Sequence, residues 1–447
     1  MNIYKHINTR PSSYFNGLYT PFGSPVGGQK RLSKSSFKED LEGLFFLLPL
    51  ALCLLVSCGK DRTYEYEEKT VGCHQMQDLM TEWYLWGDSI KDLDWQQYFA
   101  KPTDFITKLT AQSKANDKWS YCLIDTIESD PLPCGYFDHV NSYGLDVVLM
   151  NDPTGETTKQ YARVVTVYEN SPAERCGLQR NDFIGQVDNN KMASTVIKNL
   201  VNGRSHTLYV SRLGVNADGD SFYWTDHDTV TMEKSERVTV LSVMVCRMVY
   251  QDVGYLMLTD LSHTDEITAA IRRLEAQGMT DLVIDVRLCN SGTIECVCEV
   301  AKLISQVDGT FLRTFWNQKK SEYNQIYTIS ANRSSLTANH SLYFITSNYT
   351  QGAAEWLIYG LRSMSEDDAV TVVGQTTAGQ NVMLKAIPSD YQYTLYPAVA
   401  FVGDKDGNYD YASGIEPDVV INELEYAVLS PYGSTREALL NYILLNR

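Results

Sequence analysis

Positive charge is scarce in this sequence. Of its 447 residues, 38 are lysine or arginine and 55 are aspartate or glutamate, which gives a formal net charge of −17 at pH 7. A chain with this balance repels a phosphate backbone, and no dense cluster of basic residues offsets the repulsion. The sequence therefore argues against nucleic acid as a partner.

Patterns that hold metals are also missing. The seven histidines are scattered singly, and the ten cysteines include no CxxC pair, since Cys296 and Cys298 stand only two apart. Structural zinc sites use closely spaced sets of such ligands. We therefore expect no metal, and no cofactor is indicated.

Long apolar runs are absent apart from one short stretch, residues 44–56, which is too short to span a bilayer as a helix. It suits the core of a signal peptide and leads into Leu55-Val56-Ser57-Cys58, which resembles a lipobox. The sequence thus predicts an upstream segment and lipoprotein signal over 1–58, with a tether over 59–74. The alternative is a buried helix.

Lipidation at Cys58 would anchor the protein to a membrane of the cell envelope. The outer membrane is favoured, on its periplasmic or surface side. Glu39, Asp40 and Glu42 disturb the basic region that usually precedes a signal core. We therefore expect translation to start downstream, with residues 1–40 not made. Eight other cysteines are available for disulfides in an exported protein: Cys73, Cys122, Cys134, Cys176, Cys246, Cys289, Cys296 and Cys298.

Apolar residues make up 44% and charged residues 21% of the chain, which is typical of globular proteins, and the length indicates two or three domains. Residues 75–135 read as a helical cap. Leu79, Trp83 and Trp86 share one face of a helical repeat, and the pattern continues through 94–109. We interpret this aromatic stripe as core.

Residues 136–213 alternate as strands do. Their run SPAERCGLQRNDFIGQVD, residues 171–188, closely resembles a PDZ domain. Tyr143-Gly144-Leu145-Asp146 takes the place of that family's carboxylate-binding loop, which implies that a peptide C-terminus binds there and adds as a strand to the sheet edge. The alternative is a PDZ fold that serves only as a spacer. Residues 214–247 read as a linker or hairpin.

From residue 248 to 447, apolar strands alternate with helices, which predicts a layered α/β sheet. Four segments, in order, resemble the tail-specific (C-terminal processing) serine peptidases: 282–287, 347–361, 372–380 and 413–419. The resemblance implies a mixed α/β fold with a domain of the ClpP/crotonase-like type. It also implies a serine nucleophile, a lysine base of lowered pKa and backbone N–H groups that stabilise the oxyanion.

At the positions that match the family's motifs, this sequence lacks the residues that the chemistry needs. Glu355 aligns with the family's glutamate, which puts Gly352 at the nucleophile position, and the base position holds Gln380. Glycine has nothing to attack with, and an amide does not accept a proton near neutral pH. In the oxyanion loop Ser291 and Gly292 replace a pair of glycines, and Ser291 is not expected to reach glycine's backbone angles.

Four other residues carry groups that could replace the serine nucleophile or the lysine base. Thr350 is expected to be a helix N-cap without a base beside it. Lys385 falls on the opposite face of a strand from Gln380. Ser347 lies at the end of a strand, and Cys289 reads as a small apolar filler. None restores the serine–lysine pair.

The sequence therefore predicts a catalytically inactive homologue of tail-specific serine peptidases, an envelope lipoprotein that binds peptide or protein C-termini through its PDZ domain and substrate cleft. One alternative is an active serine-type endopeptidase of the same family that uses an unorthodox residue. Another is a structural surface lipoprotein that neither cleaves nor binds peptides.

Overall fold

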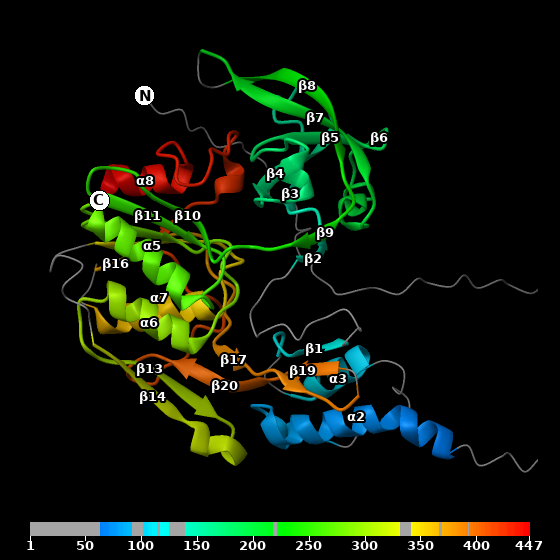
Figure 1. The fold of residues 1–447 in the computed structure, drawn as a ribbon, viewed down its shortest axis with the longest axis vertical. Helices are drawn as coiled ribbons and strands as arrows, with labels where there is room; N and C mark the ends of the chain where they lie inside the picture. The colour runs from blue at the N-terminus through cyan, green and yellow to red at the C-terminus, as the bar shows by residue number, and fades with distance from the viewer. Residues whose placement is uncertain are drawn as a thin grey trace, which may run out of the picture.

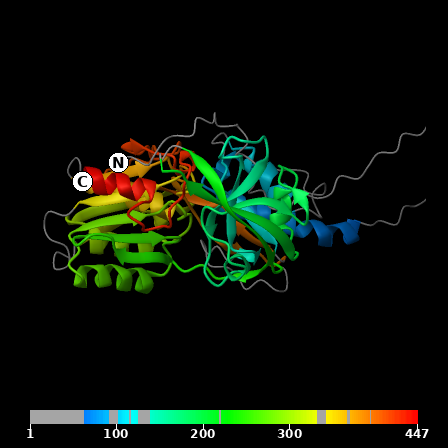
Figure 2. The ribbon, with the colours of Figure 1, turned by 90° about the horizontal axis from the view of Figure 1, so that it is seen from above.

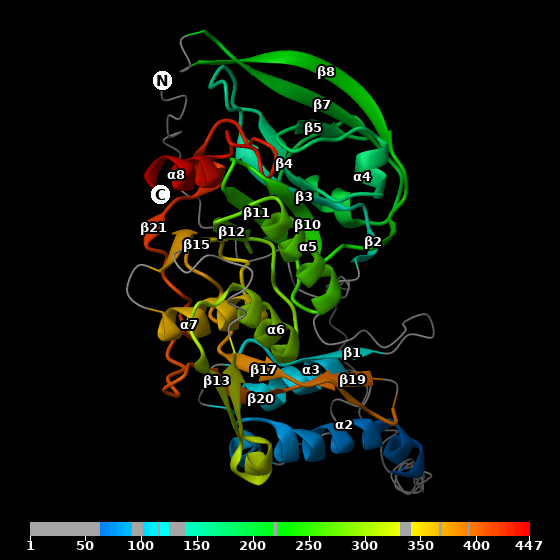
Figure 3. The same cartoon turned by 60° about the vertical axis from the view of Figure 1, so that its left-hand side comes forward.

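The computed structural model describes residues 63–91, 102–113, 117–124, 139–217, 221–330, 341–365, 369–391 and 393–447. The predicted signal segment with Cys58 and the predicted helical residues 94–99 lie outside these ranges. Three bodies follow one another along the molecule: a cap, a layered α/β domain and a sheet-rich domain (Figures 1 and 3). In the described ranges no helix combines the length and apolarity needed to cross a membrane.

The cap combines helices from early in the chain with strands from late in it. Its elements are α2 (Thr63–Trp83), η1 (Gly87–Ser89), α3 (Pro102–Thr110), β1 (Tyr121–Ile124), β18 (Ile387–Pro388) and β19 (Tyr393–Tyr396). β1 pairs antiparallel with β19, and β19 pairs with β18. The cap therefore includes the hairpin of β18 and β19, which comes from much later in the chain than the cap's helices.

The structure of the cap differs from the sequence analysis in two details. Helix α2 begins at Thr63, so most of the predicted tether over 59–74 is helical. The fully buried side chains here are Met76 and Met80 of α2 and Tyr84 just after it, whereas Leu79 and Trp83 are only partly buried. Leu79 and Trp86 pack against the cap's core, whereas the centroid of the Trp83 ring lies 6.3 Å from that of Trp316.

The sheet-rich domain is antiparallel, with strand order β3-β4-β5-β7-β8 and β6 paired to β5. Its elements are β3 (Leu145–Asn151), β4 (Gln160–Val167), α4 (Pro172–Arg175), β5 (Phe183–Val187), β6 (Asn190–Lys191), η3 (Ile197–Val201), β7 (His206–Val215) and β8 (Phe222–Met232). Because β8 pairs with β7 along its whole length, the sheet continues past the predicted boundary at 213. Strands β2 (His139–Ser142) and β9 (Glu236–Val238) pair beneath it.

The α/β domain is built on a sheet of order β10-β11-β12-β15-β16-β21, parallel except for the edge strand β10. Its strands are β10 (Val243–Met248), β11 (Val253–Leu258), β12 (Asp281–Asp285), β15 (Leu342–Thr346), β16 (Val370–Gly374) and β21 (Val419–Val420). Helices α5 (Thr264–Ala276), α6 (Ile294–Ile304) and α7 (Ala353–Met364) cover one face, and α8 (Ala438–Asn446) covers the other (Figure 2). The predicted layered α/β architecture is confirmed.

A second antiparallel sheet, of order β14-β13-β20-β17, joins this domain to the cap. Its elements are β13 (Gly309–Trp316), η4 (Gln318–Tyr323), β14 (Gln325–Ile329), β17 (Val382–Leu384) and β20 (Ala398–Gly403). Asn317, just before η4, donates to the backbone carbonyls of Glu82 (3.0 Å) and Tyr84 (2.8 Å). The cap is therefore held against the arm of this sheet.

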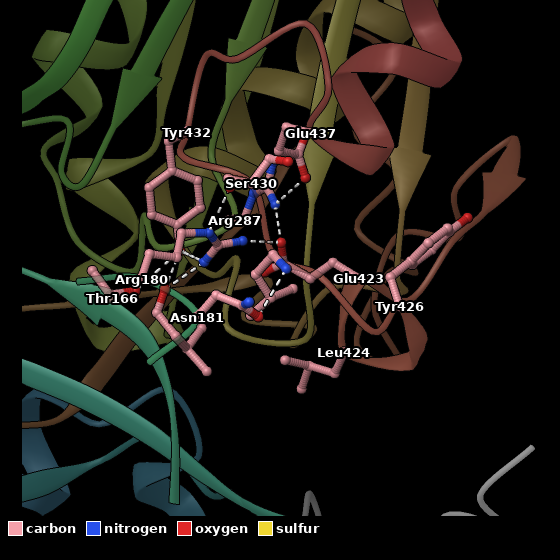
Figure 4. A network of polar contacts seen from close by, with 12 residues as sticks. Thr166, Arg180, Asn181, Arg287, Glu423, Leu424, Tyr426, Ser430, Tyr432 and Glu437 are labelled. Atoms are coloured by element: carbon pink, nitrogen blue, oxygen red, sulfur yellow. Dashed lines mark hydrogen bonds and ion pairs between the residues drawn. The ribbon is translucent and has the colours of Figure 1, made fainter. Parts of the chain in front are cut away.

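Buried charges join the sheet-rich domain to the α/β domain (Figure 4). Arg287, just after β12, contacts Asp285 at 2.7 Å, Glu423 at 2.5 Å and Glu437 at 3.0 Å. Arg180, between α4 and β5, also contacts Glu423, which lies in η5 (Glu423–Glu425). Glu423 is therefore shared by two guanidinium groups from different domains.

The pKa values reflect this sharing. Burial alone would raise the pKa of Glu423, but Arg180 and Arg287 lower it below its ordinary value. Burial alone would lower the pKa of Arg287, but its carboxylate partners raise it well above the ordinary value. Each charge is tolerated in the interior only because its partners are present.

We expect Glu423→Gln to destabilise the protein by about 3–5 kcal/mol at neutral pH, because it leaves two buried guanidinium groups undercompensated. The pKa of Glu423 is lower in the folded state, so its contribution is complete above the ordinary carboxylate value of 4.5 and is lost as the pH falls below it. Urea unfolding across this pH range measures both effects. Glu416→Gln, at an exposed carboxylate, is the control and should change little.

Candidate active site and peptide groove

Four loops meet at one edge of the parallel sheet. They follow β11, β12, β15 and β16, which are neighbours in the sheet and run in the same direction. The carboxyl ends of parallel strands are where α/β proteins place their ligand sites. The predicted oxyanion loop follows β12, the predicted nucleophile position follows β15, and the predicted base position follows β16.

Gly352 is the N-cap of α7 and adopts φ 60° and ψ −115°. This conformation is easy for glycine and costs other residues of order 1–3 kcal/mol. The preceding residue is held by a hydrogen bond from the Gln351 N–H to the Cys289 carbonyl, 3.1 Å long. The sharp turn from strand to helix is thus present, but the side chain at its apex is a hydrogen atom.

Gln380 lies beside Gly352, as the sequence predicts. A Cβ atom added to Gly352 would be 3.3 Å from Gln380 Oε1. The Gln380 side chain donates from Nε2 to the Val382 carbonyl at 3.2 Å, and its backbone carbonyl accepts from Trp356 Nε1 at 3.2 Å. The carboxamide therefore lies against the predicted nucleophile position, and its own hydrogen bond fixes it there.

Glu355 holds these two loops together. Its carboxylate is fully buried and accepts hydrogen bonds from the N–H groups of Gly352 (2.9 Å), Gly379 (2.6 Å) and Gln380 (2.7 Å), and from the hydroxyl of Thr377. Burial raises the pKa of Glu355 above its ordinary value, while the hydrogen bonds oppose that shift. Sequence reasoning used Glu355 only to align the motif and missed this role.

In the predicted oxyanion loop, Gly292 lies close to the start of α7. A Cβ atom on Gly292 would be 2.6 Å from that of Ala353, and φ there is 153°. The loop is fixed to its neighbour because Leu261 N–H donates to the Ser291 carbonyl at 2.9 Å. Ser291 does not need a positive φ, contrary to the expected strain, and its buried hydroxyl contacts no hydrogen-bonding group among the described residues.

The hydroxyl groups of Thr350 and Ser347 are engaged by the neighbouring loop. Thr350 is buried and donates to the Val286 carbonyl at 2.9 Å, so its prediction as the helix N-cap was wrong. Ser347 donates to the Arg287 carbonyl at 2.6 Å. These bonds tie the loop after β15 to the loop after β12 and leave neither residue as an attacking group.

The thiol and amine candidates are also misplaced. Burial raises the pKa of Cys289 well above its ordinary value, so it stays a neutral thiol. Lys385 Nζ lies 5.4 Å from the ring of Trp83 in the cap. Sequence reasoning missed Lys118, an exposed cap residue whose Nζ donates to the Ala378 carbonyl at 3.0 Å beside the base loop.

The predicted carboxylate loop borders an open strand edge. β3 ends the sheet order and pairs only with β4 among the described strands. Its residues Leu145, Val147 and Leu149 are half-buried against the domain core. The strand therefore presents an edge that an added peptide strand could extend, beside apolar side chains.

The loop itself differs from the prediction in detail. Tyr143 points inward, is buried, and donates to the Arg204 carbonyl at 2.5 Å. The Gly144 N–H donates to Ser142 Oγ at 2.9 Å. Asp146 accepts from the Tyr168 hydroxyl at 3.1 Å. Of the four predicted ligand residues, Tyr143 and Asp146 support the loop, and Gly144 and Leu145 border the open edge.

Glu355→Ala should destabilise the protein by about 3 kcal/mol or more, since three buried N–H groups lose their acceptor and each costs about 1–3 kcal/mol. Glu355→Gln keeps one acceptor oxygen and should cost less. Urea unfolding of both variants tests this ranking. Equal stability of Glu355→Ala and the unaltered protein would show that Glu355 does not hold the loops.

Comparisons with known proteins agree with this geometry. The profile of "Peptidase family S41" matches residues 252–421, and that of "PDZ domain" matches residues 163–201. The carboxy-terminal processing proteases CtpB and CtpA of Bacillus subtilis are each 25% identical to the chain, over 282 and 277 residues, which is 60% of this chain in both cases. The alignments cover 54% and 55% of those proteins, so the chain spans about half the length of the curated relatives it matches.

A solved structure extends the similarity. A Bacteroides fragilis protein assigned to the S41 proteases superposes with a TM-score of 0.71 at 25% identity, over 83% of this chain and 96% of the other. That match includes more of the chain than the two family profiles do. The chain therefore carries a PDZ domain followed by a peptidase family S41 domain, and it is a homologue of the carboxy-terminal processing proteases.

Proposed function

We propose that this protein binds peptide or protein C-termini without cleaving them. The observation that carries the proposal is the pair Gly352 and Gln380, which face each other where the family's chemistry needs a nucleophile and a base. The carboxamide of Gln380 does not accept a proton near neutral pH, and Gly352 has no side-chain hydroxyl to act as a nucleophile. Oxyanion stabilisation alone leaves only a small part of a serine peptidase's rate.

The binding half of the proposal rests on the PDZ domain. Edge strand β3 is open in the described structure, and half-buried Leu145, Val147 and Leu149 offer an apolar strip beside it. A peptide that adds to β3 gains main-chain hydrogen bonds and buries its own apolar side chains. Bound termini would be presented or protected rather than cut.

We also propose that the protein is an envelope lipoprotein anchored through Cys58. The support is the short apolar run and lipobox-like ending of residues 44–58. Metabolic labelling of cells with an alkyne-bearing fatty acid, followed by substitution of Cys58 with alanine, tests this. Retention of the label in Cys58→Ala would contradict the proposal.

A fluorophosphonate probe distinguishes the inactive site from an active one. We expect no stoichiometric labelling of the unaltered protein and no cleavage of casein or of C-terminally tailed peptides. Glu355 still shapes the turn, so the double variant Gly352→Ser/Gln380→Lys should gain labelling that Gly352→Ser alone lacks. Labelling of the unaltered protein that Thr350→Ala abolishes would instead support the active peptidase.

Peptide binding depends on the conformation of the loop at Gly144. With φ at +65°, a Cβ atom there would be 2.2 Å from Ser171 Cβ, so Gly144→Ala must shift the loop. We expect affinity for C-terminal peptides to fall at least about tenfold, measured by fluorescence polarisation. Gly155→Ala is the matched control, because φ is +73° but no atom lies within 4 Å of the added Cβ.

The same measurement distinguishes a binding protein from a purely structural one. If the unaltered chain binds no C-terminal peptide, the PDZ domain acts as a spacer and the proposal fails. Thermal unfolding of both glycine variants shows whether a loss of binding arises from loss of fold. Similar melting temperatures with different affinities support the groove.

A further inference from the structure

A buried histidine lies beside the predicted peptide-binding loop. His206, the first residue of β7, is only 3% exposed, and its ring centroid is 5.9 Å from that of Tyr143. Nδ1 of the ring lies 2.7 Å from Asp188 Oδ2, and Nε2 lies 2.8 Å from Asn202 Oδ1. Each ring nitrogen of this histidine therefore faces an oxygen atom.

Both of these oxygens can only accept hydrogen bonds. The Asp188 carboxylate also accepts the Thr207 N–H at 2.9 Å, and this bond and the one to His206 lower the pKa of Asp188, so the carboxylate is ionised at neutral pH. Asn202 Oδ1 also accepts the Arg204 N–H at 3.0 Å. That bond fixes the orientation of the amide, because a flipped amide would turn its NH2 group toward the N–H. Both ring nitrogens must therefore donate, and His206 is an imidazolium.

The imidazolium holds the segment that supports the loop. The Tyr143 hydroxyl donates to the Arg204 carbonyl at 2.5 Å, and burial raises the pKa of Tyr143, so this hydroxyl stays protonated. The Arg204 N–H donates to the same Asn202 oxygen that His206 contacts. Tyr143 immediately precedes Gly144, where φ is +65° and the predicted carboxylate loop turns. A continuous series of hydrogen bonds therefore leads from the His206 ring to the loop before β3.

The charge on the ring is matched by one close carboxylate. Asp188 lies on the turn after β5 and contacts Nδ1 directly. On β8, the residue opposite His206 is apolar Met232, and the carboxylate of Glu233 beside it contacts Arg175 at 3.3 Å. The stability of the imidazolium therefore depends mainly on Asp188.

We propose that His206 is a positioning residue for the peptide-binding loop and that it acts only as an imidazolium. This inference rests on the proposed binding of C-termini and adds its dependence on pH. When the ring loses a proton, Nδ1 keeps its hydrogen for Asp188, and the lone pair on Nε2 then faces Asn202 Oδ1. The exposed Asn202 side chain turns into water, and the Arg204 N–H loses its acceptor. Histidine titrates between about pH 5 and 8, so peptide binding weakens as the pH rises through that range.

The first test follows binding of a rhodamine-labelled decapeptide that ends in three apolar residues and contains no histidine, by fluorescence polarisation from about pH 5.5 to 8.5. For the full-length chain, the dissociation constant should rise about threefold to tenfold, which corresponds to the loss of one net hydrogen bond. His206→Gln should bind with nearly the same affinity at every pH, because glutamine does not titrate. His74→Gln, at an exposed histidine of the cap, is the control and should keep the full dependence.

The second test reads the protonation state without peptide. In protein labelled with ¹⁵N-histidine, the ring shifts of His206 should show two protonated nitrogens at about pH 6, and the signals absent from His206→Gln identify the residue. Asp188→Asn, at an exposed carboxylate, removes the anion beside the ring and should move the midpoints of both the shifts and the binding profile to lower pH.

A neutral His206 ring at about pH 6, or a pH dependence of binding that survives His206→Gln, overturns the assignment to His206. Failure of the peptide to bind the unaltered chain at every pH contradicts the proposed function instead. In that case the ring shifts still decide whether His206 is an imidazolium, so the two failures are distinguishable.

Discussion

The interior position of Arg287 is the constraint on which the arrangement of domains depends. A guanidinium buried to this degree is costly to desolvate, and the cost is met only when carboxylates surround it. Asp285 comes from the same strand end, whereas Glu423 and Glu437 come from the C-terminal segment. That segment must therefore return to the sheet, where Glu423 also receives Arg180 of the PDZ domain.

The shape of the candidate site depends on backbone groups and supporting side chains. Glu355 accepts the N–H groups of both the turn at Gly352 and the loop at Gln380. Gly292 allows its loop to approach α7, and the Thr350 and Ser347 hydroxyls join neighbouring loops. Since these contacts involve backbone groups or supporting side chains, the architecture of the site requires neither a serine at position 352 nor a lysine at position 380.

Sequence reasoning reached the features that short motifs encode. The α/β rhythm, the PDZ resemblance and the pairing of Gly352 with Gln380 each follow from local pattern or from motif order. The inward turn of Tyr143 and the contact of Lys118 with Ala378 depend on segments distant in sequence. The full burial of Met80 and Tyr84 has the same cause, because their core cluster includes Leu395 and Ala398 from late in the chain.

The pairing of β1 with β19 has a consequence for biogenesis. Tyr121 faces Tyr396 across this ladder, so the cap's sheet cannot form until the ribosome has made almost the whole polypeptide. Long-range strand pairing of this kind is intrinsically slow. Until β19 is made, the apolar edge of β1 is unpaired and prone to aggregation. Chaperones that shield Leu123 and Ile124 while β19 is still missing would therefore protect this edge.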